Sequence, residues 1–371
     1  MDIVGLMATQ LNLIGKLIYN VLYSWVSEWG GSAYFGAFSI TVILFTIFLK
    51  VATSPFDIWQ KRITRKNQKI MEVMKPELDK VTKQCGNNRE LLMQKQRAIY
   101  KKYKYSAFAS CLPMIITLAI FITVLTGFNS AVRYHNYTTF QNLSQVYSDS
   151  FNEKMQEIID EGRAVLDENG RPVPAEGYNE SQLRKEMEEY AEAAVVQAHE
   201  PERFLLTTNI FMPDTWANPI PTVDVFSNTG IGKLGITDVD KNEYERVMKP
   251  LMEKYNVTEK GKRAWNGYLM FPILAFILNM FGSKLNKPPE QPQMAGQTEE
   301  QIKAQQAQTK MLTYMMPIMM AVFAFLYSTA FALYMFLNSA ITTLFNLIYN
   351  IVAKKKDDKE REHRLATTLK R

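Results

Sequence analysis

The apolar residues of this chain are gathered into blocks of about twenty residues, and most charged residues lie between the blocks. A helix of that length and apolarity can cross the hydrocarbon of a bilayer, whereas a soluble protein mixes the two kinds of residue more evenly. The blocks predict an all-α polytopic membrane protein with five transmembrane helices. These predicted spans are residues 34–54, 108–128, 265–283, 311–328 and 330–352, the last two dividing one apolar stretch near Tyr327, Ser328 and Thr329.

The charge of the connecting segments predicts the orientation, because short segments rich in Lys and Arg stay in the cytoplasm. Residues 56–107 carry 14 Lys and Arg against 5 Asp and Glu, and residues 353–371 carry 8 against 4. The long segment 129–265 carries 15 against 23. We therefore expect a multi-pass membrane protein with its N-terminus outside, its C-terminus in the cytoplasm, and an acidic extracytoplasmic loop domain at 129–264. Within this loop, Ser181–Ala198 has the composition of a helix.

Residues 1–33 are predicted to form an amphipathic helix on the outer leaflet, ended by Gly30 and Gly31. A sixth span is the alternative interpretation. Its apolar face would consist of residues at helical spacing, namely Leu11, Ile14, Ile18, Val21, Leu22, Trp25 and Trp29.

Residues 55–107 are predicted to form a basic cytoplasmic hairpin of two antiparallel helices, with a turn at Gly86, Asn87 and Asn88. Pro76 interrupts the hydrogen bonding of the first of these helices and is expected to kink it. The basic surface would contact lipid headgroups or ribosomal RNA; alternatively, it is a solvated face that only sets the topology. The candidate contact residues of the hairpin are Lys61, Arg62, Arg65, Lys101, Lys102 and Lys104, and those of the basic tail at 353–371 are Lys354, Lys355 and Lys356. A second cytoplasmic loop is predicted at 284–310, between the third and fourth spans.

Lys50 lies within the first predicted span, about one turn from its cytoplasmic end. Ionised residues inside a span usually face a bundle interior or a water-filled cavity, although a lysine near a helix end can also extend to the interface. We predict a polar groove lined by Lys50 and by uncharged polar side chains of other spans, namely Thr46, Thr117, Asn338, Ser339 and Thr342.

Several short motifs follow one another along the chain, namely Lys50–Pro55 (KVATSP), Met74–Leu78 (MKPEL), Ile99–Lys101, Cys111–Pro113 (CLP), Asn209–Trp216 (NIFMPDTW), Met315–Ile318 and Leu333–Tyr334. In this order they resemble the YidC family of membrane protein insertases. The chain departs from the family pattern where Lys50 replaces the usual arginine, and also at Thr117, Ala119 and Met335. The loop between the second and third spans is longer than the family pattern implies, and the short N-terminal region resembles Gram-positive members.

The resemblance implies a membrane protein insertase and chaperone that works through a polar groove open to the cytoplasm, without nucleotide hydrolysis. It implies nascent membrane proteins and membrane lipid as partners, with the ribosome and the Sec translocon as further candidates and no DNA. The sequence contains no phosphate loop, nucleophile elbow or metal-ligand motif, and its two cysteines and three histidines are too few for a zinc-type cluster. We therefore expect no enzyme activity, metal or cofactor. The alternative function is a channel or transporter that moves a small solute through a polar cleft.

Overall fold

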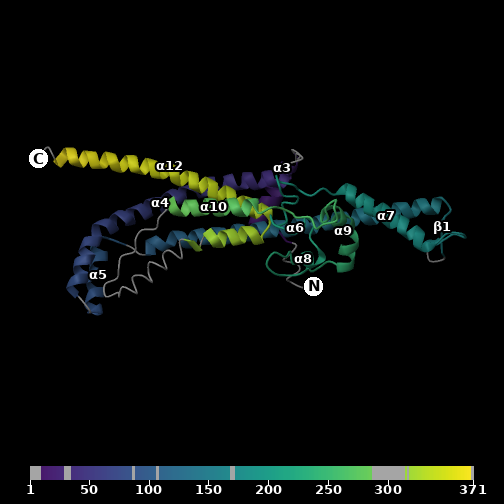
Figure 1. The fold of residues 1–371 in the computed structure, drawn as a ribbon, viewed down its shortest axis with the longest axis horizontal. Coiled ribbons are helices and arrows are strands. Elements are labelled where there is room, and N and C mark those ends of the chain that lie inside the picture. The colour runs from purple at the N-terminus through teal and green to yellow at the C-terminus, as the bar shows by residue number, and fades with distance from the viewer. Residues whose placement is uncertain are drawn as a thin grey trace. The chain divides into compact units, whose positions relative to one another are not determined.

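The computed structural model describes residues 10–28, 35–85, 88–105, 108–167, 172–285, 314–315 and 317–368, and these are mostly helical (Figure 1). Three helices in the described part are long and apolar enough to cross a membrane, Ala37–Cys85, Ile115–Asp160 and Thr329–Lys356. Two shorter apolar helices, Met270–Leu285 and Pro317–Leu326, lie at the third and fourth predicted spans. The helical membrane-protein class predicted from the apolar blocks is therefore confirmed.

The chain divides into two compact units, and several helices contribute to both. Unit 1 comprises Met1–Leu44, Leu125–Pro272 and Phe323–Leu333. Unit 2 comprises Phe45–Val124, Ile273–Val322 and Tyr334–Arg371.

Helix α4, Ala37–Cys85, runs without a break from the first predicted span into the predicted hairpin. Pro76 and Pro55 both lie inside this helix, which continues past each of them, and the kink expected at Pro76 stays a prediction. Proline removes one N–H donor and leaves the carbonyl four residues earlier without its helical partner. At Pro55 that carbonyl belongs to Val51, and the hydroxyl of Ser54 donates to it at 2.8 Å.

Helix α5, Arg89–Lys102, returns beside the end of α4 and completes the hairpin in unit 2 (Figure 1). Asn88 begins the helix, because its side-chain oxygen accepts from the backbone N–H of Leu91 at 3.1 Å. Gly86 and Asn87 of the predicted turn lie outside the described residues. The two helices enclose a small apolar core formed by Met71, Met74, Leu78 and Ile99, against which Val81, Tyr100, Tyr103 and Tyr105 pack.

Helix α6, Phe108–Asp160, continues far beyond residue 128, where the second span was expected to give way to a loop domain. The change from apolar to polar composition marks the end of the apolar segment and not the end of the helix. The later part of α6 keeps one buried face, with Phe140, Leu143 and Tyr147 at helical spacing. Burial of this face stabilises the later part of the helix.

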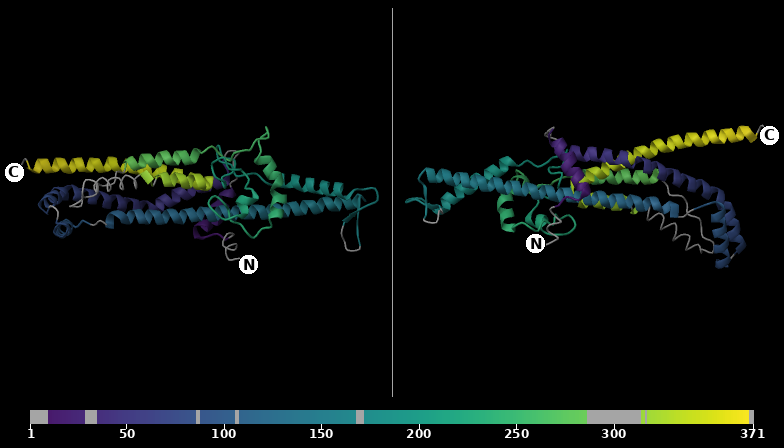
Figure 2. Two further views of the ribbon diagram at one scale, coloured as in Figure 1. Left: turned by 60° about the horizontal axis from the view of Figure 1, so that its bottom comes forward. Right: turned by 180° about the vertical axis from the view of Figure 1, so that it is seen from behind.

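The rest of unit 1 contains helices α7, Glu180–Ala198, α8, Val223–Ser227, and α9, Lys241–Tyr255. The helix expected over Ser181–Ala198 is confirmed as α7, which lies beside the end of α6 (Figure 2). Ion pairs join α6 and α7. Oε1 of Glu186 in α7 lies 3.2 Å from Nζ of Lys154 in α6, and Glu186 also forms an ion pair with Arg163, which follows α6. Strands β1, Ala164–Leu166, and β2, Pro172–Pro174, form a small antiparallel sheet between α6 and α7 in the chain.

The N-terminal segment consists of α2, Leu13–Lys16, the π-helix η1, Leu17–Tyr23, and α3, Ser24–Ser27. It packs closely on α6: a side chain added at Gly127 would lie 2.3 Å from Ile14, and Ser130 bonds the backbone of Asn12 and of Gln10. At 1.5 Å per residue the run 13–27 is about 22 Å long, which is less than a hydrocarbon core. A run of this length is short for a sixth span, and the position of the segment on the outer leaflet stays a prediction. Gly30 and Gly31 lie outside the described residues.

Helix α10, Met270–Leu285, is followed by residues 286–313, which lie outside the described part, as does most of the predicted loop 284–310. The break expected near Tyr327 and Ser328 is confirmed, because one apolar helix ends at Leu326 and α12 begins at Thr329. Helix α12, Thr329–Thr368, includes residues 353–368 of the predicted tail.

Candidate functional site

A polar stripe on α12 is the main feature of unit 2 that fits the predicted groove. Ser339, Thr343 and Asn346 are buried, although they belong to an otherwise apolar helix. They are four and three residues apart, so they share one face of the helix. The stripe approaches α10, because a side chain added at Gly282 would lie 3.3 Å from the hydroxyl oxygen of Thr343.

Asn346 carries an unusual chemical feature within this stripe. Its side chain is 2% exposed, and its Oδ1 has no hydrogen-bond partner among the described residues. An unpaired buried amide oxygen is costly, of the order of 1–3 kcal/mol, unless water or a ligand donates to it. Asn346 therefore marks a place where a donor from outside the protein would be stabilised.

The other uncharged groove candidates have different surroundings. Thr46 is fully buried in α4, whereas Thr117 is exposed on α6. Asn338 is half-buried, and its carbonyl accepts from the hydroxyl of Thr342 at 2.7 Å. Thr342 is thus satisfied within its own helix, and the deeper polar positions of α12 are Ser339, Thr343 and Asn346.

Lys50 has an acidic partner two turns along the same helix. Its Nζ lies 3.4 Å from Oδ2 of Asp57, and the two side chains are 16% and 29% exposed. Helical side chains normally lean toward the N-terminus, so a lysine that pairs seven residues downstream is extended along the helix. Lys61 follows Asp57 by one turn; burial lowers the pKa of Lys61, and the charge of Asp57 acts in the opposite direction. Lys50, Asp57 and Lys61 therefore form a group of three charges of alternating sign along α4.

The basic residues of the hairpin divide into exposed side chains and side chains that hold the fold together. Arg62, Lys101 and Lys104 are exposed. Arg65 donates to the carbonyl of Ala353 at 2.7 Å, which joins α4 to α12 within unit 2. The tail residues Lys354, Lys355 and Lys356 are all exposed.

Lys102 belongs to a polar clamp at the base of the hairpin. Its Nζ donates to both oxygens of Glu77, at 2.8 and 2.9 Å, and the hydroxyl of Tyr103 donates to the same carboxylate at 2.7 Å. These donors hold the pKa of Glu77 below its usual range. Glu77 of the MKPEL motif thus fastens α5 to α4.

The NIFMPDTW motif organises the beginnings of two apolar helices in unit 1. The Asp214 carboxylate accepts from the backbone N–H groups of Tyr268, Leu269 and Phe271, at 2.9, 3.1 and 2.8 Å, and so caps α10. At the start of α12, the N–H groups of Thr329 and Ala330 donate to the carbonyls of Met212 and Ile210, at 2.8 and 2.9 Å. The motif is therefore a structural connector rather than a groove lining.

Gly267 permits this capping. A side chain added there would lie 2.0 Å from Oδ1 of Asp214. Asn266 reinforces the same junction, because its side chain donates to the carbonyls of Asn209 and Pro213 at 2.9 and 2.8 Å.

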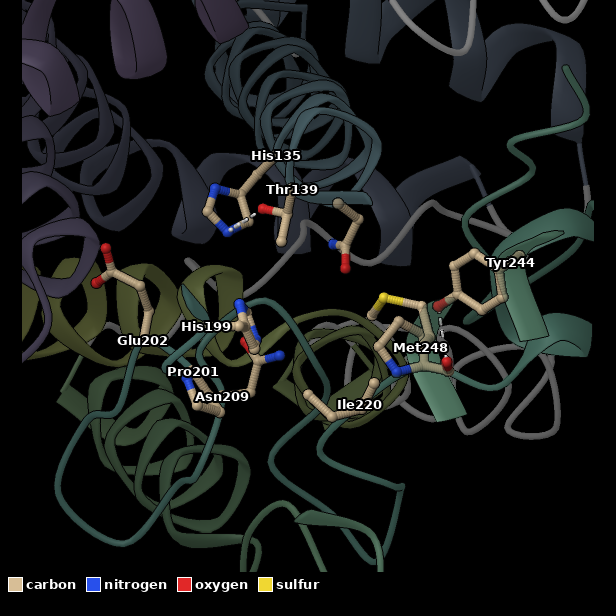
Figure 3. A pocket seen from close by; sticks show the side chains of 11 residues that line it. His135, Thr139, His199, Pro201, Glu202, Asn209, Ile220, Tyr244 and Met248 are labelled. Atoms are coloured by element: carbon tan, nitrogen blue, oxygen red, sulfur yellow. Dashed lines mark hydrogen bonds between the residues drawn. The ribbon is translucent and has the colours of Figure 1, made fainter. Parts of the chain in front are cut away.

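Unit 1 also contains a buried polar cavity of about 20 Å³, large enough for one water molecule (Figure 3). His135 of α6 stacks on Phe211 with the ring centres 3.6 Å apart, and burial, then the charge of His199, lowers its pKa to about 3. Burial, then Lys254, lowers the pKa of His199 to about 4.

Glu202 lines the same cavity. It accepts from the hydroxyl of Tyr23 at 2.9 Å and from the N–H of Phe38 at 3.0 Å, while burial raises its pKa. These contacts fasten the beginning of α4.

No group of three or more potential metal ligands is found among the described residues. The side chains that the structure collects are hydrogen-bonding and charged groups of structural junctions and of the polar stripe.

The chain matches the model of a family described as 60Kd inner membrane protein, over residues 30–166 and 202–357. The chain belongs to the 60Kd inner membrane protein family. The YidC-type resemblance of the motifs is thereby confirmed. The family match leaves out residues 167–201, which contain β2 and α7, in agreement with an extended loop.

Curated relatives of this family are named membrane protein insertase YidC. The chain is 27% identical to the Fusobacterium nucleatum protein over 117 residues, which are 31% of this chain and 55% of the relative. It is 30% identical to the Clostridium tetani protein over 94 residues, or 25% of this chain and 41% of the relative. The chain therefore matches about half of the length of these relatives or less. No solved structure matches the chain with comparable significance.

Three functional features of this family member were missed by sequence reasoning. Asp57 could have been noticed as the nearest acid on the cytoplasmic side of Lys50. Asn346 continues the spacing of Ser339 and Thr343 and could have been found by extending that series. The capping role of Asp214 has no local signal, because its partners lie more than fifty residues away.

Proposed function

We propose that this protein is a membrane protein insertase that helps nascent hydrophobic segments and short hydrophilic tails enter the bilayer. The observation that carries the proposal is the buried polar stripe Ser339, Thr343 and Asn346 inside an apolar helix of unit 2. The names of the family relatives support it. A polar stripe of this kind gives a hydrophilic segment hydrogen-bonding groups at membrane depth.

The proposed topology has five spans, with the N-terminus outside and the C-terminus in the cytoplasm of a bacterial cell. The helices α4, α6, α10, Pro317–Leu326 and α12 would supply the spans. The basic hairpin and tail would then lie in the cytoplasm, and the acidic segment 129–264 outside. The exposed apolar faces of α10 and α12 support contact with lipid, at Ile273, Ile277, Leu344, Ile348 and Ile351.

The proposed groove opens to the cytoplasm and contains Lys50 and the α12 stripe. A hydrophilic tail crosses an intact bilayer slowly because its charges and peptide groups lose water. A wet groove that reaches partway into the membrane reduces that cost, and Lys50 attracts acidic groups of the tail. Burial of the client's apolar helix in lipid provides the net driving force, so nucleotide hydrolysis is not required.

The proposed partners are nascent membrane proteins, membrane lipid, the ribosome and the Sec translocon. The exposed Arg62, Lys101 and Lys104 of the hairpin are suited to anionic partners, as are the exposed tail lysines Lys354, Lys355 and Lys356. Arg65 and Lys102 contribute less, because each is bonded within the hairpin or to α12.

The decisive experiment depletes the protein and follows the insertion of small membrane proteins, with complementation by Asn346→Leu. Asn350→Leu is the matched control, because Asn350 lies one turn later on α12 and is exposed. We expect Asn346→Leu to reduce insertion and Asn350→Leu to restore it fully. Normal insertion after depletion, together with loss of a solute flux, would instead indicate a channel or transporter.

A further inference from the structure

An exposed apolar turn in unit 1 is not covered by any of the residues that the structure describes. Phe204 and Thr207 exchange two backbone hydrogen bonds, at 3.1 and 3.0 Å, so Leu205 and Leu206 are the two central residues of a tight turn. Leu205 has a φ of 52°, whereas the φ of Leu206 is not positive. A turn with a positive φ at its first central residue favours glycine there. Leucine in this position is unfavourable for a loop in water.

Both leucine side chains point away from the core of unit 1. Leu205 is 49% exposed and Leu206 is 59% exposed, whereas the flanking Phe204 and Thr207 are buried. Two amphipathic aromatic residues, Trp265 and Tyr268, are similarly exposed, and their ring centres lie 6.1 Å apart. The backbone joins these features, because Thr208 donates to the carbonyl of Asn266 at 2.9 Å.

The turn lies at the level where two apolar helices begin. The Phe204 ring stacks on Phe271, in the first turn of α10, with centres 5.4 Å apart. Phe204 also contacts Phe35, which precedes α4, at 5.5 Å and through a backbone bridge. Trp265 and Tyr268 precede α10 directly in the chain. If α4 and α10 are spans, their first turns lie where the hydrocarbon meets the headgroups.

We infer that Leu205, Leu206, Trp265 and Tyr268 form a lipid-contacting surface that rests in the outer leaflet of the membrane. Tryptophan and tyrosine prefer this interface because their rings combine an apolar body with a polar group. The two leucines reach the acyl region next to them, which explains why apolar residues occupy a strained, exposed turn. This lipid contact requires that α4 and α10 span the membrane, as proposed above, but it does not require insertase activity.

The test uses the full-length protein in vesicles of phosphatidylcholine and phosphatidylglycerol that contain brominated lipid. The five natural tryptophans are replaced by phenylalanine, and a single tryptophan is placed at Leu206 or restored at Trp265. Val165→Trp is the matched control, because Val165 is an equally exposed apolar residue in β1 of the same unit. Since Trp265 is a natural residue, it reports even if Leu206→Trp does not fold.

We expect blue-shifted emission and quenching by shallow brominated lipid at positions 206 and 265, and red emission without quenching at position 165. Aqueous iodide should quench only the tryptophan at position 165. Emission and lipid quenching at 206 and 265 that match position 165 would overturn the inference. If both failed to be quenched while client insertion remained normal, the proposed function would stand and only this lipid contact would be lost.

Discussion

Replacing Asp57 by asparagine should reveal whether Lys50 is available to a client. The Lys50 Nζ and the Asp57 carboxylate lie 3.4 Å apart. Coulomb attraction at this separation is about 5 kcal/mol at an effective dielectric of 20 and about 1 kcal/mol in water. Because both side chains keep some solvent contact, the net value should be near the lower end, about 1–2 kcal/mol.

An acidic client tail would have to compete with Asp57 for Lys50. Removal of the competitor by Asp57→Asn should therefore favour the client contact by about 5-fold to 30-fold, the factor that corresponds to 1–2 kcal/mol. The assay is site-specific crosslinking from position 50 to two versions of one client, with an acidic or a neutral tail, together with their insertion rates. We expect the increase only for the acidic tail.

Substitutions of Lys50 complete this test. Lys50→Arg should keep activity because the charge remains, although the guanidinium has a different shape. Lys50→Glu should impair insertion of acidic-tailed clients while the protein stays abundant. Equal activity of all three residues at position 50, and no effect of Asp57→Asn on the acidic tail, would refute the reasoning. Lys50 would then only extend to the interface and pair with Asp57.

Three further perturbations probe the structural junctions. Glu77→Gln should loosen the hairpin relative to Glu72→Gln, an exposed control. Because the pKa of Glu77 is lowered in the folded protein, the stabilisation of the hairpin by this carboxylate should be complete above the ordinary carboxyl pKa and should be lost as the pH falls through the pKa of the folded state. Hydrogen exchange of α5 measures both effects, and equal exchange in the two variants would contradict them. Asp214→Ala should lower the free energy of unfolding by about 2–4 kcal/mol, because α10 loses its N-terminal cap, and Asp214→Asn should have an intermediate effect. Thermal unfolding in detergent measures this change, and an unchanged melting temperature would exclude the capping role. The pKa values of His135 and His199 are lowered to about 3 and about 4, so below pH 6.5 the unfolded chain binds more protons than the folded protein. The free energy of unfolding should therefore decline as the pH falls from 6.5 toward 4, and His135→Gln should reduce this decline. A melting temperature that is constant over this pH range would contradict the buried neutral state of these histidines.

Local composition was sufficient for the membrane class and for several helices. The apolar blocks, the basic hairpin and the break before Thr329 can be read from nearby residues, because hydrophobic burial and turn formation depend on short-range patterns. The order of short motifs likewise identified the family that the comparison confirms. The apolar composition marked where the predicted spans end, at residues 54 and 128, but it did not reveal that α4 and α6 continue as helices beyond these residues.

The sequence by itself determined which segments are apolar, which are basic, and in what order they follow one another. Only the tertiary structure decided that Asp214 caps α10, that Glu77 holds Lys102, and that the buried Asn346 has an Oδ1 without a hydrogen-bond partner in the described part of the chain. These contacts join residues that are distant in the chain or depend on which helix face is covered. Periodicity predicts that a helix has a face, but the neighbours that cover that face are selected by packing of the whole chain.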